Sequence, residues 1–376
     1  MPIQVPQHDI WTYLTTAQKP VVLYGTGNGA DKILDQLLLR GIRISGIFAS
    51  SDFVRNRTFR GYPVETYEAL HTRLGDMIVL ICFGTSRPEV LENIDRIAGE
   101  CETYAPDVPV YGQVLFDRKF FDAHAEMLER VRDRLSDDVS RATFDAIVQY
   151  KLSGDYKLLR PVARPLSEAK ELLTIVNDAA FLDLGAYNGD TVQLYTSLFP
   201  QIRNIVAVEP DARNYRKLQE NTAGLTGEEA SARSIFCIRA LVSDHDGTAR
   251  IDRNKGRGVH ENAHQESRKS VVNASAPAQT ENVNELTAAT IVTLLQGQKA
   301  GLIKMDVEGN ELLAIEGGRE VIRRDRPSLI VSCYHRSEDL FTLPLLLSEL
   351  VPEYKIYLRH HPHLLCWDTE FYLTLS

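Results

Sequence analysis

A glycine-rich turn and two acids in the second half of the chain have the residue types and spacing of a nucleoside-binding site. The run FLDLGAYNGDT (181–191) places Asp183 in an apolar strand-like segment, and Gly185 and Gly189 follow it before an expected helix. Glycines let a backbone approach a ligand closely, and the start of a helix presents free N–H groups. Glu209 ends the next strand-like run, where a carboxylate can accept hydrogen bonds from ribose hydroxyls. The spacing predicts a nucleoside site at the carboxyl ends of two parallel strands.

The pattern of the turn also distinguishes between classes of nucleotide. It is neither the G-x-G-x-x-G of dinucleotide sites nor a phosphate-binding Gly-Lys-Ser, so a nucleoside without phosphates fits better than NAD or ATP. The structural alternative is that Gly185 and Gly189 only permit a tight strand-to-helix turn, and that Glu209 is a solvated strand end.

Apolar runs that alternate with helical patterns place this site in the second of two βα segments. In the first segment we expect strands at 21–25, 42–48 and 77–84, with helices at 28–40 and from residue 88. In the second segment the expected strands are 180–184, 204–209, 234–240, 301–306, 328–335, 355–360 and 370–375. Strands separated by helices are typical of parallel sheets, so the expected fold class is α/β with two Rossmann-like domains.

The length of the chain bears on its division into domains. Because 376 residues are too many for one ordinary domain, we expect two folding units. The predicted division is a Rossmann-like domain at 1–115, a charged helical connector at 116–165 and a second domain at 166–376. A polar stretch between residues 252 and 285 is far longer than an ordinary connection, and such insertions are usually lids or disordered segments.

The charge balance and the cysteines limit the partners and the compartment. Lysine and arginine number 42 against 51 aspartates and glutamates, a net charge of −9 that repels nucleic acids and anionic membranes. No apolar run approaches the ~18 residues of a membrane span, and the chain starts without an export-signal pattern. Five scattered cysteines without a C-x-x-C pair indicate reduced thiols. We therefore expect a cytoplasmic protein with no membrane span and no nucleic-acid partner.

Four runs of the second segment together carry a family resemblance. They are LDLGAYNGDT (182–191), VAVEPDARNYRKLQEN (206–221), LIKMDVEGNELLAIEGG (302–318) and LIVSCYH (329–335). In this order they resemble the FkbM family of S-adenosylmethionine-dependent methyltransferases, from about residue 137 onward. The resemblance implies a class I methyltransferase sheet of seven strands, ordered 3-2-1-4-5-7-6 with the last strand antiparallel. It also implies O-methylation with S-adenosylmethionine as the cofactor and S-adenosylhomocysteine as its product. The acceptor we expect is a saccharide or related hydroxyl compound, free or carrier-linked.

The resemblance assigns cofactor roles to individual residues. Asp183, Gly185 and Gly189 would shape the turn and Glu209 would hold the ribose, while Asp211 and the backbone of 240–241 would border the adenine. The full predicted cofactor set is Asp183, Gly185, Ala186, Tyr187, Gly189, Asp190, Glu209, Asp211, Ala240 and Leu241. The chain departs from the family pattern at Tyr187, where asparagine is frequent, and in the long polar insertion.

Methyl transfer to a hydroxyl needs a base, because the acceptor oxygen loses its proton during attack. The candidates are Lys304, Asp306 and Glu308 around the end of the expected fourth strand, and His335 at the end of the fifth. Carboxyl ends of parallel strands meet at one edge of a sheet, so these four side chains could converge. His335 is the preferred base because a neutral imidazole can accept a proton near neutral pH, and Asp306 would orient the hydroxyl or the base.

Each of these residues has a structural alternative. Asp306 and Glu308 are also the acids that favour the first turn of a helix, and His335 could be a half-buried side chain bonded to a backbone carbonyl. A carboxylate pair is a weak signature of a divalent cation. The run HHPHLLC (360–366) lacks a distal partner pair at zinc spacing, so we expect no metal and interpret it as a connection rich in surface histidines.

The first domain contains a second glycine-rich turn. VVLYGTGNGA (21–30) follows an expected strand and opens an expected helix, and its Gly25, Gly27 and Ala30 fit G-x-G-x-x-[GA], with Asn28 between them. The acid expected for an NAD ribose is not clearly in place. The run through GYPVETYEAL (61–70) resembles the Rossmann-like domains of enzymes that modify nucleotide sugars. This resemblance implies a sugar nucleotide or carrier-linked substrate there, whereas the alternative is a domain without a ligand.

Three functions remain open from the sequence. The favoured one is an O-methyltransferase that uses the second domain. The others are an NAD-dependent oxidoreductase that uses the turn at 25–30, and a non-catalytic cofactor-binding protein. A homo-oligomer is possible under all three.

Overall fold

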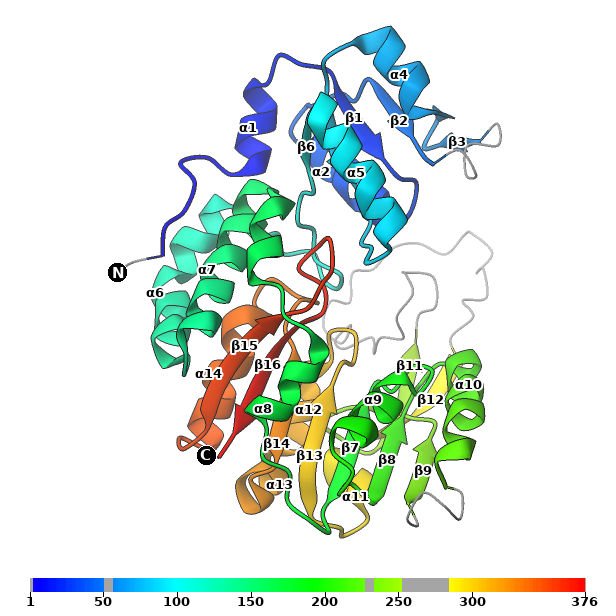
Figure 1. Cartoon of the computed structure of the whole chain (residues 1–376), viewed down its shortest axis with the longest axis vertical. Helices are drawn as coiled ribbons and strands as arrows, with labels where there is room; N and C mark the ends of the chain where they lie inside the picture. Colours follow the sequence, from blue (N-terminus) through cyan, green and yellow to red (C-terminus); the bar gives the residue numbers. More distant parts are fainter. Residues whose placement is uncertain (1–2, 51–56, 227–232, 252–283, 376) are drawn as a thin grey trace, which may run out of the picture. The chain divides into compact units, whose positions relative to one another are not determined.

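The computed structural model describes residues 3–50, 57–226, 233–251 and 284–375 (Figure 1). By their internal contacts the residues form two units. The first unit comprises Met1–Leu166, Cys333–Phe341 and Tyr357–Glu370. The second comprises Ser167–Ser332, Thr342–Ile356 and Phe371–Ser376. The domain boundaries expected from the sequence stay predictions.

The first unit contains a six-stranded sheet with the order β3-β4-β2-β1-β5-β6 (Figure 1). Its strands are β1 (Val21–Tyr24), β2 (Gly46–Phe48), β3 (Thr58–Phe59), β4 (Tyr62–Glu65), β5 (Ile78–Ile81) and β6 (Glu102–Tyr104). The β1 strand is parallel to β2 and β5, and only β3 pairs antiparallel, with β4. The described helices of this segment are α1 (Ile10–Thr16), α2 (Asn28–Leu39), α4 (Tyr67–Leu74) and α5 (Pro88–Glu100).

The observed strands of this sheet differ in part from the expected ones. The strands β1 and β5 are buried along their whole length, which is why both read as continuous apolar runs. The strand expected at 42–48 is shorter, because only Gly46–Phe48 enters the ladder with β1. The short strands β3, β4 and β6 were not expected, since runs of two to four residues carry little periodicity.

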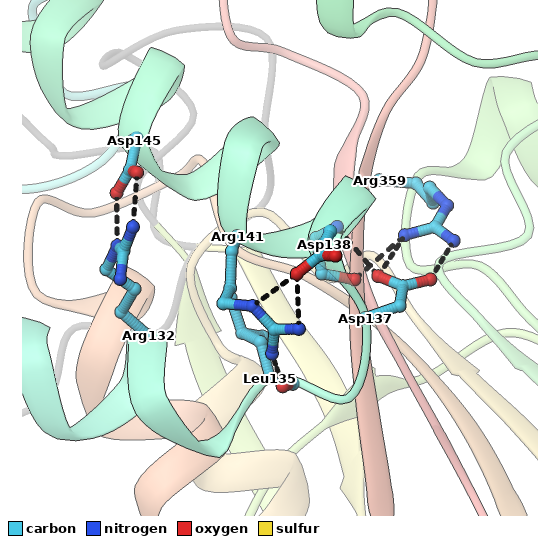
Figure 2. Close-up of polar contacts among 8 residues, drawn as sticks. Arg132, Leu135, Asp137, Asp138, Arg141, Asp145 and Arg359 are labelled. Carbon is cyan, nitrogen blue, oxygen red and sulfur yellow. Dashed lines mark hydrogen bonds and ion pairs between the residues drawn. The ribbon is translucent and has the colours of Figure 1, made fainter. Parts of the chain in front are cut away.

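The charged stretch at 116–150 forms two helices, α6 (Arg118–Arg134) and α7 (Asp138–Ser153). Figure 2 shows the ion pairs around them. Arg132 of α6 makes a two-bond pair with Asp145 of α7, with N···O distances of 2.6 and 2.8 Å. At the start of α7, Asp137 accepts a hydrogen bond from the Ser140 N–H at 2.7 Å. The same carboxylate pairs with Arg359, whose side chain is only 2 % exposed.

The second unit is built around a seven-stranded sheet with the order β15-β16-β14-β13-β7-β8-β9 (Figure 1). Its strands are β7 (Ala180–Leu184), β8 (Asn204–Val208), β9 (Ser234–Ile238), β13 (Ala300–Met305), β14 (Ser328–Ser332), β15 (Lys355–His360) and β16 (Thr369–Thr374). Numbered in chain order, this is the expected order 3-2-1-4-5-7-6. The five strands from β14 to β9 pair parallel with their neighbours.

Helices follow most of these strands, as a parallel sheet requires. They are α8 (Ala169–Leu172), α9 (Asp190–Leu198), α10 (Ala212–Thr222), α11 (Ile291–Leu295), α12 (Glu311–Gly317), α13 (Arg319–Asp325) and α14 (Asp339–Leu350). Among the helices of the described ranges, none has both the length and the apolar character that crossing a bilayer demands.

The structure corrects one expectation about the second unit and adds a small sheet that the sequence did not predict. The strand expected at 328–335 ends at Ser332, so His335 lies beyond the strand instead of at its last position. A small sheet of β10 (Leu241–Val242), β11 (Gly247–Ile251) and β12 (Asn284–Ala289) was not expected. The antiparallel pair of β11 and β12 brackets the polar insertion. Residues 252–283, to which the lid interpretation applies, lie outside the described residues.

The start of α7 supplies a test of stability. Replacing Asp137 by alanine removes the helix cap and leaves a buried guanidinium without its carboxylate, so the free energy of unfolding should fall by about 3–5 kcal/mol. The neighbouring Asp138, whose side chain is 98 % exposed beside Arg141, is the matched control and should cost less than about 1 kcal/mol as Asp138→Ala. Urea denaturation of both variants measures the difference, and equal losses would contradict the role given to Arg359.

Candidate active site

The turn after β7 is folded back onto the end of β8. Gly185 and Gly189 both have positive φ, 83° and 87°. The N–H groups of Gly185 and Ala186 both donate to the carbonyl of Val208 at 2.9 Å, and Gly189 N–H donates to the Ala186 carbonyl at 2.7 Å. The two glycines therefore adopt a conformation that other residues rarely take, and the turn is fixed to the neighbouring strand.

Gly185 also lets two strand ends come into close contact. A Cβ atom at this position would lie 1.8 Å from the carbonyl oxygen of Asp306, at the end of β13. A Cβ on Gly189 would lie 3.1 Å from side-chain atoms of Leu218 and Thr222 on α10. Any side chain at Gly185 would separate the turn from β13.

Glu209 is a buried carboxylate and not a solvated strand end, because only 6 % of it is exposed. It follows β8 and accepts two backbone hydrogen bonds, from Tyr187 N–H at 3.0 Å and from Asp211 N–H at 2.8 Å. Burial raises the pKa of Glu209 to about 7, and the two backbone hydrogen bonds oppose this rise. Tyr187 itself has a positive φ of 47° and a half-exposed side chain. The structure thus holds an acid and an exposed aromatic together at the turn.

Asp183 is fully buried in β7. The Thr191 hydroxyl donates to its Oδ2, whereas its Oδ1 has no hydrogen-bond partner among the described residues. Burial raises the pKa of Asp183 to about 6, and the charge of Lys304 acts in the opposite direction. Lys304 is the register partner of Asp183 on the adjacent strand β13.

The remaining predicted cofactor residues also belong to the second unit. Asp190 is the first residue of α9, and Gly189 is its N-cap. Asp211 caps α10, where its carboxylate accepts hydrogen bonds from the N–H groups at positions 213 and 214. Ala240 and Leu241 are buried just after β9, and the end of that strand is tied to β8 by a bond from Glu209 N–H to Ile238 O at 3.1 Å.

Three of the four base candidates lie around the end of β13. Lys304 is buried, and its Nζ is 3.5 Å from Oδ2 of the partly exposed Asp306. Glu308 is partly exposed with a positive φ of 56°. Glu311, the first residue of α12, is fully buried and accepts a hydrogen bond from Val307 N–H at 2.9 Å. The turn after β13 is therefore held by an acid that the sequence interpretation did not select.

His335 belongs to the first unit. It is 1 % exposed, its carbonyl accepts a hydrogen bond from Tyr111 N–H at 2.8 Å, and its ring lies 4.1 Å from that of Tyr334. Lys304, Asp306 and Glu308 belong to the second unit, so their convergence with His335 stays a prediction.

Sequence reasoning passed over three residues of the second unit that the structure places beside the selected ones. Thr191 holds Asp183, Glu311 holds the turn after β13, and the neighbouring Asn310 is 1 % exposed with an Nδ2 that has no partner among the described residues. All three lie within the runs that carried the family resemblance, and this membership was the available signal.

The histidine run at 360–363 is not a surface feature. His360 and His361 are 0 % and 3 % exposed. His360 Nδ1 lies 3.0 Å from the Thr369 hydroxyl, and His361 Nδ1 lies 2.7 Å from the Arg164 carbonyl. Burial lowers the pKa of His360 to about 3. The expectation of surface histidines is wrong because His360 and His361 are buried and each has a polar partner within the first unit.

The glycine turn of the first unit lies between β1 and α2, as expected from the sequence. Gly25 has a φ of 116°, Gly27 is the N-cap of α2, and Asn28 begins that helix. At Gly29, in the first turn of α2, a Cβ atom would lie 2.2 Å from the carbonyl of Cys82, which follows β5. Ala30, the last position of the expected motif, is fully buried.

Comparisons with known proteins bear on the second half of the chain and on its fold. Residues 183–361 match the methyltransferase FkbM domain. The matched range contains every predicted cofactor residue and all four base candidates. The comparison thus supports a methyltransferase.

Solved structures extend the comparison to the whole chain. The crystal structure of methyltransferase FkbM from Methylobacillus flagellatus KT covers 98 % of this chain and 94 % of that chain, with a TM-score of 0.69 and 21 % identity. At this identity the likeness shows a common fold. Precorrin-6y C5,15-methyltransferase from Geobacter metallireducens GS-15 covers 59 % and 87 %, but its TM-score of 0.30 and 11 % identity are too low to carry an argument. No curated protein matches the sequence of this chain.

Glu209 gives the folded protein a pH dependence that needs no ligand to be measured. Because its pKa rises from 4.5 to about 7 on folding, the folded protein keeps a proton between these pH values that the unfolded chain loses. The contribution of Glu209 to stability is therefore full below pH 4.5 and falls by up to roughly 3 kcal/mol as the pH rises to 7. Urea denaturation of the wild type and Glu209→Gln across this range should give a difference that changes with pH. A constant difference would refute the raised pKa.

Proposed function

We propose that the protein is an S-adenosylmethionine-dependent O-methyltransferase that binds its cofactor in the FkbM domain, at the turn 185–189 and at Glu209. The observation that carries the proposal is the buried Glu209 carboxylate, held by two backbone N–H groups beside a turn where Gly185 leaves no room for a side chain. A carboxylate at the end of the second strand suits two ribose hydroxyls, and a closely approaching backbone suits the adenosine. The cofactor would supply an electrophilic methyl group on a sulfonium.

The residues present fit such a cofactor in charge as well as in shape. Asp183 has an unpartnered buried oxygen beside the same turn, so it offers an acceptor to a positively charged group. Asp211, Ala240 and Leu241 would border the adenine. Tyr187 is exposed at the turn, where its ring could pack against a bound ligand.

The acceptor we propose is a hydroxyl of a saccharide or related small molecule, free or carrier-linked. The proposed architecture is a class I methyltransferase sheet with an antiparallel last strand, preceded by a Rossmann-like first domain whose turn at 25–30 could hold part of the acceptor. The protein is proposed to be cytoplasmic, and the five cysteines are free in the structure.

His335 is proposed to remove the acceptor proton, with Asp306 orienting the hydroxyl or the base. A positioned base lowers the barrier because the oxygen becomes a better nucleophile as its proton leaves. Asp306 and Glu308 are the alternative bases, since both are partly exposed at the end of β13.

Cofactor binding can be tested by calorimetry with S-adenosylhomocysteine. Glu209→Ala removes two hydrogen bonds to a charged acceptor, each worth about 1.5–3 kcal/mol, so affinity should fall at least tenfold. Glu220→Ala, which changes an exposed glutamate on α10, is the matched control and should bind like the wild type. A folded Glu209→Ala protein with unchanged affinity would show that the ribose site lies elsewhere.

The base can be tested with a panel of saccharides and S-adenosylmethionine labelled in its methyl group. His335→Ala should lower the turnover of the best acceptor by roughly 10²–10⁴, while affinity for S-adenosylhomocysteine stays nearly constant. If His335→Ala retains near-full activity and Asp306→Asn or Glu308→Gln loses it, the base is an acid at the end of β13. If no hydroxyl acceptor is methylated but the cofactor binds, O-methylation is wrong.

A further inference from the structure

Lys304 occupies an unusual place for a lysine. It lies in β13, at the centre of the seven-stranded sheet, and only 4 % of it is exposed. Lysines are rarely buried unless a partner compensates their charge. A specific role is therefore expected for this side chain.

The strand geometry places two acids beside Lys304. Asp183 is its register partner on β7, and paired residues on adjacent strands point to the same face of a sheet. Asp306 lies two residues further along the chain, on the same face, with its Oδ2 3.5 Å from the Lys304 Nζ. The Lys304 ammonium thus forms an ion pair with Asp306, and its charge also acts on Asp183 on the neighbouring strand.

The surroundings of Asp183 show why this ammonium matters. Asp183 is completely buried, and among the residues that the structure describes the Thr191 hydroxyl is its one hydrogen-bond donor. Burial raises its pKa, and the negative charges of Asp190 and Asp306 act in the same direction. Of the causes acting on Asp183, the charge of Lys304 is the largest that favours the ionised form. A second buried acid of the same unit, Glu311, accepts a hydrogen bond from the Val307 N–H.

We propose that Lys304 is a positioning residue that keeps Asp183 and Asp306 together as two carboxylates, and so makes this edge of the sheet receptive to a cation. This role differs from proton transfer, for which an ammonium beside two acids is poorly suited. Its consequence for the cofactor rests on the proposed function: the cationic groups of S-adenosylmethionine would meet a carboxylate at Asp183 and not a neutral acid.

The charge coupling can be measured without any cofactor. The difference in unfolding free energy between the wild type and Asp183→Asn reports the titration of Asp183 alone. Because its pKa is raised from 3.8 to about 6, this contribution should be full below pH 3.8 and be lost as the pH rises through 6. In a Lys304→Met background the pKa of Asp183 in the folded protein should be higher by about one unit or more, since a nearby opposite charge lowers an acid's pKa by 1–3 units. The loss of stability should therefore continue to a pH that is higher by the same amount.

Two further variants keep this measurement decisive. Lys304→Arg retains the positive charge, so the pH at which the stability contribution of Asp183 is lost should equal that of the wild type. If Lys304→Met alone does not fold, the double variant Lys304→Met/Asp306→Asn removes both members of the Lys304–Asp306 ion pair at once. Asp183 then still lacks the Lys304 charge, so the end of its pH-dependent loss should still move to higher pH. If the contribution of Asp183 is lost over the same pH range with and without Lys304, the proposal is wrong.

A second arm tests the consequence for the cofactor by calorimetry. At pH 7 Lys304→Met should bind S-adenosylmethionine at least tenfold more weakly than the wild type, and the loss should diminish as the pH rises to 9. A loss that is equal at all pH values would indicate damage to the fold and would overturn the role in positioning. If the wild type binds neither S-adenosylmethionine nor S-adenosylhomocysteine, the proposed function fails, whereas the pH dependence of unfolding still decides the role of Lys304.

Discussion

The contact between the backbone of Gly185 and the carbonyl of Asp306 is the constraint on which the candidate site depends. It can form only because position 185 has no side chain and accepts a positive φ. The same turn is bonded to Val208, so the ends of β7, β8 and β13 are joined at one point. Asp183, Glu209 and Asp306 come from these three strands. Main-chain packing therefore holds these three acids near the turn, although their negative charges repel one another.

This arrangement accumulates buried negative charge that the protein must compensate. Glu209 accepts hydrogen bonds from the N–H groups of Tyr187 and Asp211, and Glu311 accepts one from Val307 N–H. Asp183 accepts a hydrogen bond from the Thr191 hydroxyl and is stabilised by the charge of Lys304. Groups of this kind cost stability when they are buried, and they persist where they serve a site. The raised pKa values of Asp183 and Glu209 are the measurable sign of that cost.

Much of the second unit could be predicted because its central strands are buried on both faces. The strand AFLDL is found at Ala180–Leu184 as expected, and the order of all seven strands agrees with the family pattern. The end of β14 could not be located, because Cys333 and Tyr334 continue the apolar and aromatic run after the ladder has stopped at Ser332. The pairing of β11 with β12 joins segments that are far apart in the sequence, and no local pattern reports such a pairing. Glu311 was passed over for a related reason, since an acid at the first turn of a helix is ordinary until the fold shows that it is buried.

The ion pair between Asp137 and Arg359 has a consequence for how the chain is made. The two residues are 222 positions apart, and Arg359 lies in a segment that belongs to the first unit although it follows most of the second. At about 5–20 residues per second, a ribosome would need on the order of 10–40 s to synthesise the chain between them. During that time α7 exists without the arginine that pairs with its capping carboxylate. The second unit also includes Phe371–Ser376, so neither unit is complete until translation has passed residue 370. The first unit as a whole therefore cannot finish folding before residue 370 has been synthesised, which differs from the usual order in which an N-terminal domain folds first.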